Sequence, residues 1–436
     1  MIKELIIADD FTGGLDTGVM FAEKGFATWM SDDQRRLCEC DEDCVAVMDT
    51  ETRHLKREDA LENVRKIAEF ARKQKIPILF KKTDSLLRGN IGAELEGMIQ
   101  GSGRKLVVFV PAYPKMGRTI NEGKLLIQGK LLTDTNYVDD LISPVNKNRV
   151  KDIIRAQTTV PVREIGCLNG ISGVAANPEI YICDTVGEKD LRLIAEAVKP
   201  VADQVILAGC GGFAKYVAEY LTGLYIEQKK QVFYPKAECE EQTVFCGSVN
   251  ERTQEQVKYA AEKGIFLYKL RPEEYLEEES LEKTGQHLVD LQRQKKTLLI
   301  CTALKNEDIY CASVYAKRHG ILQEELYERI ACGLGRIAAI CMQEADKREF
   351  SVVGGDTLYR TMDAAGYKTI QPVALLQEGA VLSKVYWKKG NTSFVVSKAG
   401  SFGSRAAIWK MFQKENQEER GVKKEEQINE KGNIDL

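Results

Sequence analysis

Histidine is scarce in this chain, which limits the kinds of catalysis open to it. The 436 residues include only three histidines, His54, His287 and His319, and these stand far apart. No HExxH or HxH pattern offers two ring nitrogens on one face, so histidine-centred chemistry is not expected. The sequence also lacks a GxSxG motif and a cysteine–histidine arrangement, which argues against hydrolysis by a covalent route.

Two ligand-binding motifs are also missing. The nearest approach to a Walker A motif joins Gly117 to Gly123-Lys124, but the separation is wrong and Leu125 replaces the required hydroxyl. A P-loop enzyme is therefore not expected. The cysteine-rich segment 38–44 has no matching pair of ligands downstream, so we interpret it as loop cysteines in preference to a structural zinc site.

Long apolar runs and a strong charge of either sign are absent too. No run approaches the roughly 20 apolar residues that a membrane-spanning helix needs, and Met1 leads into a strand-like segment instead of a signal peptide. The net charge of −3 favours neither nucleic acid nor an anionic membrane as a partner. The twelve cysteines are scattered, which indicates reduced thiols and a cytoplasmic protein.

The first half of the chain does contain a regular alternation of strand-like and helix-like segments. Strands are predicted over residues 5–8, 44–50, 76–80 and 106–110. The first is followed by a predicted glycine turn at Gly13-Gly14 and by a helix from about Leu15 to Lys24. Alternation of this kind is typical of a parallel sheet covered by helices.

Polar residues recur where these strands end. Asp9 and Asp10 follow the first strand, Thr50 and Arg53 the second, residues 82–88 the third and residues 113–118 the fourth. Because the carboxyl ends of parallel strands meet at one edge of a sheet, this recurrence predicts a ligand site there. Asp and Thr also cap helices well, so one of these groups is expected to be a cap, but not all of them.

The segment KTDSLLRGN, residues 82–90, concentrates cations, an acid and hydroxyls between a strand and a helix. Lys and Arg suit a small anion such as a sugar acid, and Arg can hold a carboxylate in bidentate fashion. A carboxylate can orient a hydroxyl and accept its proton, as in phosphoryl transfer. Asp84 is preferred to Asp10 in that role because it shares a loop with Lys82 and Arg88.

The second half restarts after a charged stretch around residues 231–241, the predicted domain boundary. Three loops of small and hydroxyl residues follow, at Ser248, at residues 354–357 and at residues 400–404. Glycine lets a backbone approach a phosphate, and the N–H groups at a helix start favour an anion. An anion site in one domain and phosphate loops in the other suggest a kinase that closes between two lobes.

The predicted fold is α/β with two domains, each a largely parallel sheet flanked by helices, and with the active site in the cleft between them. Residues 1–235 would form the substrate domain, residues 240–413 the nucleotide domain, and residues 414–436 a charged and flexible tail.

Five motifs carry a specific resemblance. ADDFTGGLDTG, KTDSLLRGN, PAYPKMGRT, GGDT and KAGSFGS, in this order, resemble those of the four-carbon acid sugar kinase family. The resemblance extends from about Leu5 to Ser404. It implies an N-terminal sugar-acid domain, a C-terminal ATP-binding domain, and ATP- and Mg²⁺-dependent phosphorylation of threonate, erythronate or 3-oxo-tetronate at the terminal hydroxyl.

The resemblance also implies the site residues. Those expected to bind the sugar acid are Asp10, Arg53, Lys82, Thr83, Asp84, Ser85 and Arg88. Those expected to bind ATP are Ser248, Gly354, Gly355, Asp356, Thr357, Gly400 and Gly403. The resemblance does not settle the catalytic base; Asp84, Lys82 and Asp10 are the residues expected to be catalytic, with Asp84 preferred as the base, and no residue is assigned to a metal.

Two positions depart from the family pattern. Asp356 stands where many members have Glu, and this shorter acid could still reach a nucleotide hydroxyl or a metal. Ser401 stands where Asn is common, which leaves the nucleotide contacts of that loop open.

Two other functions remain as alternatives. One is a non-catalytic sensor of ATP or a sugar acid, which would be expected to have lost the acids and cations that are present here. The other is an isomerase or epimerase of a phosphorylated sugar acid, which would need no nucleotide. The substrate's stereochemistry depends on side-chain placement that sequence does not fix. A homodimer is one assembly that the sequence leaves open.

Overall fold

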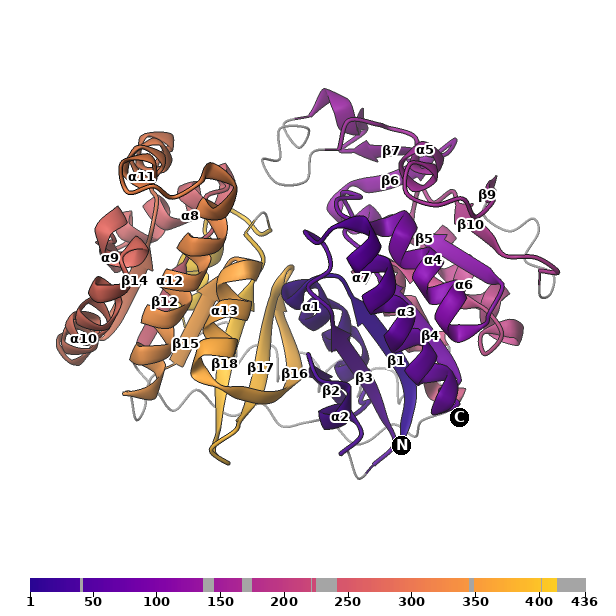
Figure 1. Cartoon of the computed structure of the whole chain (residues 1–436), viewed down its shortest axis with the longest axis horizontal. Coiled ribbons are helices and arrows are strands. Elements are labelled where there is room, and N and C mark those ends of the chain that lie inside the picture. Colours follow the sequence, from indigo (N-terminus) through magenta and orange to yellow (C-terminus); the bar gives the residue numbers. More distant parts are fainter. Residues whose placement is uncertain are drawn as a thin grey trace, which may run out of the picture. The chain divides into compact units, whose positions relative to one another are not determined.

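The protein is described here by a computed structural model (Figure 1). It describes residues 1–39, 42–135, 145–166, 175–220, 222–224, 241–344, 349–400 and 402–413. These fall into two compact units: the described residues from 1 to 224 with Lys368–Val373, and those from 241 to 367 with 374 to 413. Ser401, the expected tail at 414–436 and the expected boundary at 235–240 lie outside the described residues.

The first unit contains a parallel sheet. Its strand order is β2 (Thr28–Ser31), β3 (Cys44–Asp49), β1 (Ile2–Ala8), β4 (Ile78–Lys82), β11 (Ile206–Gly209), β5 (Leu106–Val110), β10 (Glu179–Cys183) and β9 (Val162–Ile165). Each of these neighbouring pairs runs parallel. The chain builds β3 on one side of β1 and then β4 on the other, so the strand order reverses at β1. Ligands bind outside the carboxyl ends of strands at such a reversal.

Helices cover this sheet in pairs. They are α1 (Phe11–Ala22), α2 (Gln34–Leu37), α3 (Arg57–Lys73), α4 (Ile91–Ser102), α5 (Val150–Arg155), α6 (Glu188–Val198) and α7 (Gly211–Tyr220), with α3 packed on α4 and α1 on α7. Alternate residues of β1, Leu5 and Ile7, join one core with apolar residues of α3 and α4. The strands are buried on both faces, which is why they read as continuous apolar runs in the sequence.

A small antiparallel sheet follows β5, made of β6 (Arg118–Asn121), β7 (Lys124–Ile127) and β8 (Lys130–Leu131). The turn between β7 and β8 is Gln128-Gly129, where both residues have positive φ. Glycine adopts this conformation without strain, and the pair therefore reverses the chain in two residues.

The second unit contains a largely parallel sheet with an antiparallel side. Its strand order is β13 (Phe266–Lys269), β14 (Thr297–Cys301), β12 (Gln242–Cys246), β15 (Glu349–Val353), β18 (Thr392–Lys398), β17 (Ala380–Trp387) and β16 (Tyr367–Gln377). Residues 368–373 of β16 belong to the first unit. The strands from β13 to β18 run parallel, and β17 runs antiparallel to β18. The α/β class predicted for both domains is confirmed.

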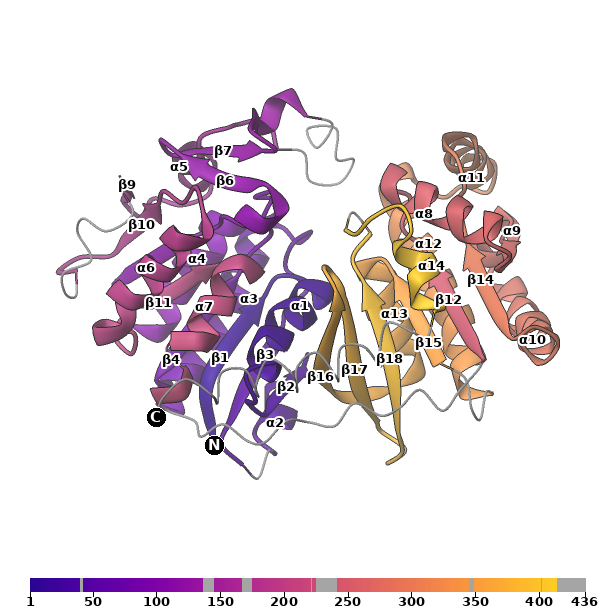
Figure 2. The same cartoon turned by 180° about the vertical axis from the view of Figure 1, so that it is seen from behind.

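Two cores lie on the two faces of the parallel strands. Phe245 and Ile300 pack with α10 (Glu278–Gln294) and α12 (Gln323–Gln343). Val244 and Cys301 pack with α8 (Glu251–Glu262) and α14 (Ala407–Met411), which lie side by side in Figure 2. The other helices are α9 (Pro272–Leu276), α11 (Asn306–Arg318) and α13 (Gly355–Ala365). Within the described ranges, no helix combines the length and apolar composition that a membrane span requires.

Candidate functional site

Asp9 and Asp10 follow β1, and one arginine holds both of them. Arg53 Nε donates to Asp9 Oδ2 at 2.8 Å, and Arg53 Nη2 donates to Asp10 Oδ1 at 2.5 Å. Asp10 stands at the N-cap of α1, yet its side chain makes no capping hydrogen bond. A capping role therefore does not account for this carboxylate, and its charge is directed at Arg53.

Lys82 ends β4 and brings a second cation to the same carboxylates. Its Nζ lies 4.0 Å from Asp9 Oδ1 and 4.0 Å from Asp10 Oδ1. A Cβ on Gly13 would lie 2.3 Å from Asp10 Oδ1 and 2.4 Å from Lys82 Nζ. The glycine turn predicted at residues 13–14 is wrong, because α1 already begins at Phe11. Gly13 instead leaves space on the helix for the charged cluster.

The loop after β4 is held by two arginines. Arg88 Nε donates to Asp84 Oδ2 at 2.6 Å and Arg88 Nη2 donates to Asp84 Oδ1 at 3.2 Å, a bidentate pair. Arg118, at the start of β6, donates through Nη1 to Ser85 Oγ. Thr83 is buried, and its Oγ1 has no hydrogen-bond partner among the described residues. The Asp84 carboxylate and the Ser85 hydroxyl are thus fixed by arginines within three residues of Lys82, while the Thr83 hydroxyl is buried beside them.

Charge sets the protonation of the acids around this cluster. Burial alone would raise the pKa of Asp9, but Arg53 and the lysines 82 and 81 lower it below its usual value. Burial is likewise outweighed at Asp84, where Arg88 and Arg53 lower the pKa well below its usual range. At Asp49 burial, then Glu51 and Asp10, raise the pKa well above its usual value. Asp9 and Asp84 are therefore anions at neutral pH, while Asp49 retains its proton more readily.

Buried polar groups of β4 and α4 hold the loop that carries Arg53. Lys81 Nζ lies 3.0 Å from Glu94 Oε2, with both side chains at most 1% exposed. Thr52 Oγ1 donates to Glu94 Oε1 at 2.5 Å. Asn90 Nδ2 donates to the carbonyl oxygens of Thr52 and Leu55 at 3.0 and 2.8 Å. The start of α4 thereby sets the position of the arginine.

In the second unit, the candidate nucleotide residues meet through hydroxyls and backbone. Ser248 Oγ lies 3.0 Å from Thr253 Oγ1, and Thr253 Oγ1 donates to Gly400 O at 2.8 Å. A Cβ on Gly400 would lie 2.2 Å from Ser248 Oγ. The loop after β12 and the loop after β18 are thus in direct contact, and glycine makes the contact possible.

The loop after β15 joins the same group. Gly354 has φ 115° and donates its N–H to Lys398 O at 3.0 Å, and α13 begins at the next residue, Gly355. Thr357 is buried in the first turn of α13, where a Cβ on Gly247 would lie 2.0 Å from its Oγ1. Asp356 is exposed. The strand ends of β12, β15 and β18 therefore converge as those of β1, β3 and β4 do.

A lysine that the sequence reasoning did not assign lies beneath these loops. Lys398 is 1% exposed, and its Nζ donates to Ala399 O at 2.9 Å and to Gly400 O at 3.4 Å. Burial lowers its pKa to about 8. Gln256 Nε2 donates to the carbonyl oxygens of Phe402 and Gly403 at 3.0 and 3.3 Å, holding the same loop from α8.

The structure thus brings the predicted residues together in two groups, one in each unit. The sequence predicted Asp9 and Arg118 at the ligand edge of the sheet without giving them a role. It left out Asn90 and Glu94 in the first unit, and Thr253, Gln256 and Lys398 in the second. Asn90 and Lys398 lie inside the quoted motifs, which could have identified them. Glu94, Thr253 and Gln256 lie outside every motif. Among the described residues, no group of three or more His, Cys, Asp and Glu is arranged to hold a metal ion.

Known proteins match both units. Residues 5–217 match the family described as the sugar-binding N-terminal domain, and residues 243–408 match the nucleotide-binding C-terminal domain. A D-threonate kinase of Salmonella typhimurium is 28% identical over 93% of this chain and 97% of its own length. The chain belongs to the four-carbon acid sugar kinase family.

Other members of this kinase family differ in the substrate they are named for. A D-erythronate kinase of Heliobacterium modesticaldum is 28% identical over 79% of this chain and 80% of its own. A 3-oxo-tetronate kinase of Pseudomonas fluorescens is 25% identical over 92% and 94%. The family is therefore clear, while identities this similar do not single out one acid.

Solved structures share the fold. A Haemophilus influenzae protein of the DUF1537 family superimposes with a TM-score of 0.66 at 20% identity, covering 95% of this chain and 99% of that one. A protein of Salmonella typhimurium LT2 gives a TM-score of 0.74 at 19% identity, covering 96% and 100%.

Proposed function

We propose that this kinase transfers the γ-phosphoryl group of ATP to the terminal hydroxyl of a four-carbon sugar acid in carbohydrate catabolism. The observation that carries the proposal is the convergence of Asp10, Arg53 and Lys82 from three strand ends, at the point where the strand order reverses. Two cations beside two carboxylates suit a substrate that is both an anion and a hydroxyl donor. The members named above act on threonate, erythronate and 3-oxo-tetronate.

The contacts favour Asp10 over Asp84 as the group that orients the hydroxyl and accepts its proton. Asp84 is engaged by Arg88 through both carboxylate oxygens, and its lowered pKa makes it a weak base. Asp10 has 19% of its side chain exposed, against 10% for Asp84. We therefore assign Asp84 to fixing Arg88, and we assign Lys82 to balancing the charge near Asp10. The sequence-based prediction of Asp84 as the base stays untested.

The glycine-lined group in the second unit fits the phosphates of ATP. Gly354, Gly355 and Gly400 allow close backbone approach, and the start of α13 offers N–H groups to an anion. Ser248 and Thr357 add hydroxyls there. ATP supplies the phosphoryl group, and the expected Mg²⁺ would be held largely by its phosphate oxygens, as magnesium sites in kinases usually are.

A coupled ADP-release screen tests this function. The full chain is mixed with Mg-ATP and a panel of D- and L-threonate, D- and L-erythronate and the 3-oxo-tetronates. Turnover of at least one acid, with none for the corresponding sugars without a carboxylate, supports the proposal. ATP binding without turnover of any acid would favour the sensor instead. An absence of ATP binding would contradict the kinase and leave the isomerase.

A further inference from the structure

Helix α1 begins directly after Asp10 and is almost entirely buried. Of residues 11–21, only Gly13 and Asp16 are partly exposed. They stand three residues apart, so they lie on one face of the helix, separated by about 4.5 Å along its axis. Asp10 and Lys82 meet on the same face, since a Cβ on Gly13 would contact atoms of both. Asp16 therefore follows one helical turn beyond that meeting point.

The position of α1 is fixed at its start and along its length. Phe11 N donates to Glu51 Oε1 at 2.8 Å, which holds the first residue of the helix. A Cβ on Gly14 would lie 2.8 Å from Met30 Cε, so the helix packs closely on the strand that carries Met30. Side chains on an element held in this way can place a hydrogen bond accurately.

The Asp16 carboxylate lies against the start of α7, which follows β11. A Cβ on Gly211, the first residue of α7, would lie 3.0 Å from Asp16 Oδ2. β11 pairs with β4, and Gly209 stands opposite Lys82 in the register. α1 and α7 pack together, as Figure 1 shows. Asp16 thus lies at the same edge of the sheet as Lys82.

The charges near Cys210, which joins β11 to α7, agree with this placement. Burial raises the pKa of the Cys210 thiol to about 11, while Lys82 and Arg118 act to lower that pKa and Asp16 acts to raise it. All three charged groups therefore lie near one strand end. Two cations and the positive end of α7 favour a carboxylate at this position.

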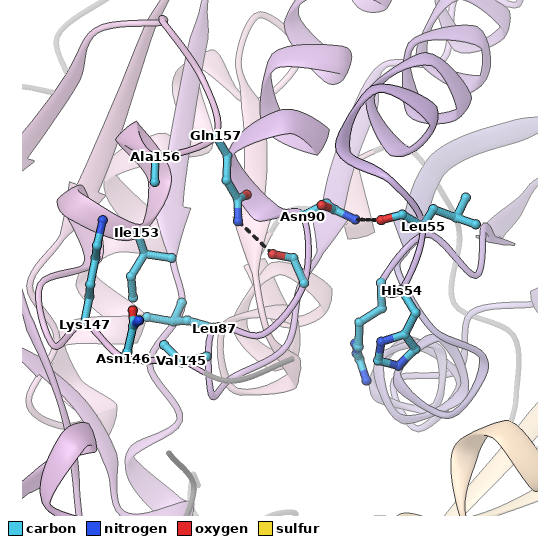
Figure 3. A pocket seen from close by; sticks show the side chains of 12 residues that line it. His54, Leu55, Leu87, Asn90, Val145, Asn146, Lys147, Ile153, Ala156 and Gln157 are labelled. Carbon is cyan, nitrogen blue, oxygen red and sulfur yellow. Dashed lines mark hydrogen bonds between the residues drawn. The ribbon is translucent and has the colours of Figure 1, made fainter. Parts of the chain in front are cut away.

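Arg53 also lines a pocket of about 360 Å³ in the first unit (Figure 3). Among the described residues, Asp10, Lys82 and Asp16 are not part of its lining. The partly exposed face of α1 is therefore separate from this pocket, although Arg53 bonds to Asp10 and reaches both. A ligand that bonds to Asp10 and Asp16 lies along α1 and not in the pocket.

Two acids on one face of α1 decide which part of a sugar acid can lie there. Like charges repel, so the substrate's own carboxylate is disfavoured beside Asp10 and Asp16. Its hydroxyls can donate to both acids, and hydrogen bonds to a charged group are stronger than those between neutral groups. The hydroxyls of a short carbon chain can reach two acceptors that stand one helical turn apart. The face of α1 thus suits the hydroxyl-bearing part of the substrate.

We infer that Asp16 accepts a hydrogen bond from a secondary hydroxyl of the sugar acid while the terminal hydroxyl lies at Asp10. The substrate carboxylate then points away from α1. This inference rests on the proposed function and deepens it, because it names a residue that distinguishes acids by their hydroxyls. Asp16 thereby contributes to the choice between acids that differ at C2 or C3, as threonate and erythronate do.

Wild-type kinetics with acids that lack one hydroxyl test this inference. The substrates are the best tetronate from the screen, 3,4-dihydroxybutanoate, which lacks the 2-hydroxyl, and 2,4-dihydroxybutanoate, which lacks the 3-hydroxyl. Loss of a hydrogen bond to a charged group should lower kcat/KM by about ten- to a hundredfold for at least one of the two deoxy acids. Equal kcat/KM for all three acids would overturn the inference, whether or not a variant folds.

Asp16→Ala and Asp16→Asn identify the residue responsible. Asp16→Ala should lower kcat/KM for the tetronate by a similar factor, with no further loss on a deoxy acid that the wild type already disfavours. The KM for ATP should not change, and Asp16→Asn should lose less because its amide can still accept a hydrogen bond. Glu23→Gln is the matched control, since Glu23 is an exposed acid at the other end of α1. The same loss on all three acids would indicate a structural role and overturn the inference.

The results separate this inference from the proposed function. If no acid is phosphorylated, the proposed function fails. Calorimetric titration of D-threonate, D-erythronate and the two deoxy acids into the full chain then decides the role of Asp16. Tighter binding of a tetronate than of a deoxy acid, lost in Asp16→Ala but kept in Glu23→Gln, supports that role. Equal binding of all the acids, or no binding, overturns it.

Discussion

The two units gather their strand ends in the same way but use different chemistry there. In the first unit the group consists of ion-paired side chains: Asp9 and Asp10 with Arg53, and Asp84 with Arg88. In the second unit it consists of hydroxyls, glycines and backbone around Gly400. A small sugar acid offers little surface, so charge must supply its recognition. A triphosphate is itself highly charged, so close backbone approach is enough to hold it.

Each unit also buries a lysine, and the two differ in their partners. Lys81 is paired with Glu94. Lys398 bonds to carbonyl oxygens, and burial lowers its pKa to about 8. Because its pKa is lowered, Lys398 loses its charge at mildly alkaline pH. Its titration therefore predicts pH sensitivity in the nucleotide unit.

Asp10→Asn should have the largest effect, because it should lower turnover without changing ATP binding in the second unit. The neutral amide keeps the shape but cannot accept a proton, so kcat should fall by about 10²- to 10⁴-fold. The Kd for ATP should not change, which calorimetry would check. If Asp10→Asn lost ATP affinity as well as turnover, the two units could not have the separate roles proposed, with the sugar acid in the first and ATP in the second. If kcat fell in Asp84→Asn but not in Asp10→Asn, Asp84 would be the base instead of Asp10.

Glu94→Gln should destabilise the first unit. It leaves Lys81 buried without an anionic partner, which costs about 3 kcal/mol or more of unfolding free energy. Hydrogen exchange of the β4 amides in increasing urea reports on this unit by itself. Glu96→Gln on the same helix is the control, because Glu96 is more exposed and accepts from Gln100 and Thr158, and about 1 kcal/mol or less is expected there. Equal losses would contradict the role of the Lys81–Glu94 pair.

Gly400→Ala should weaken ATP binding and leave acid binding intact. Its Cβ would meet Ser248 Oγ, and overpacking of this kind costs about 1–3 kcal/mol, or about ten- to a hundredfold in Kd. The double variant with Ser248→Gly removes the clashing atom and should recover part of the affinity. Calorimetry with ATP and with the acid measures both. Unchanged ATP affinity in Gly400→Ala would mean that this loop does not meet the nucleotide.

Mildly alkaline pH should have the smallest effect, and only on the nucleotide. As pH rises through about 8, Lys398 loses its proton and its attraction for phosphate, so the Kd for ATP should rise several-fold between pH 7 and pH 9. Lys398→Met should bind ATP more weakly at pH 7 and show a flat profile, while Lys389→Met, an exposed control, should behave as wild type. A pH dependence that persists in Lys398→Met would assign it to another group.

The convergence of Asp10, Arg53 and Lys82 could be predicted from the sequence, because the topology of a parallel sheet places its strand ends at one edge whatever the side-chain conformations are. Sequence reasoning could not predict that Asp10 leaves its N-cap uncapped, since capping and ion pairing use the same residue type. Nor could it find Glu94, because its partner Lys81 is one of two adjacent buried lysines and only the fold shows which of them meets α4. The sequence predicts a turn at Gly13 because it does not show that Asp10 on the same helix and Lys82 on another strand both exclude a side chain there.

The most direct test of the central claim is phosphorus NMR of the reaction mixture with the best acid and Mg-ATP. We expect one phosphomonoester signal, coupled to the methylene protons of the terminal carbon, growing in equal amount with ADP. We also expect that Asp10→Asn abolishes that signal while ATP still binds. Inorganic phosphate in place of the ester, or an ester on another hydroxyl, would contradict it.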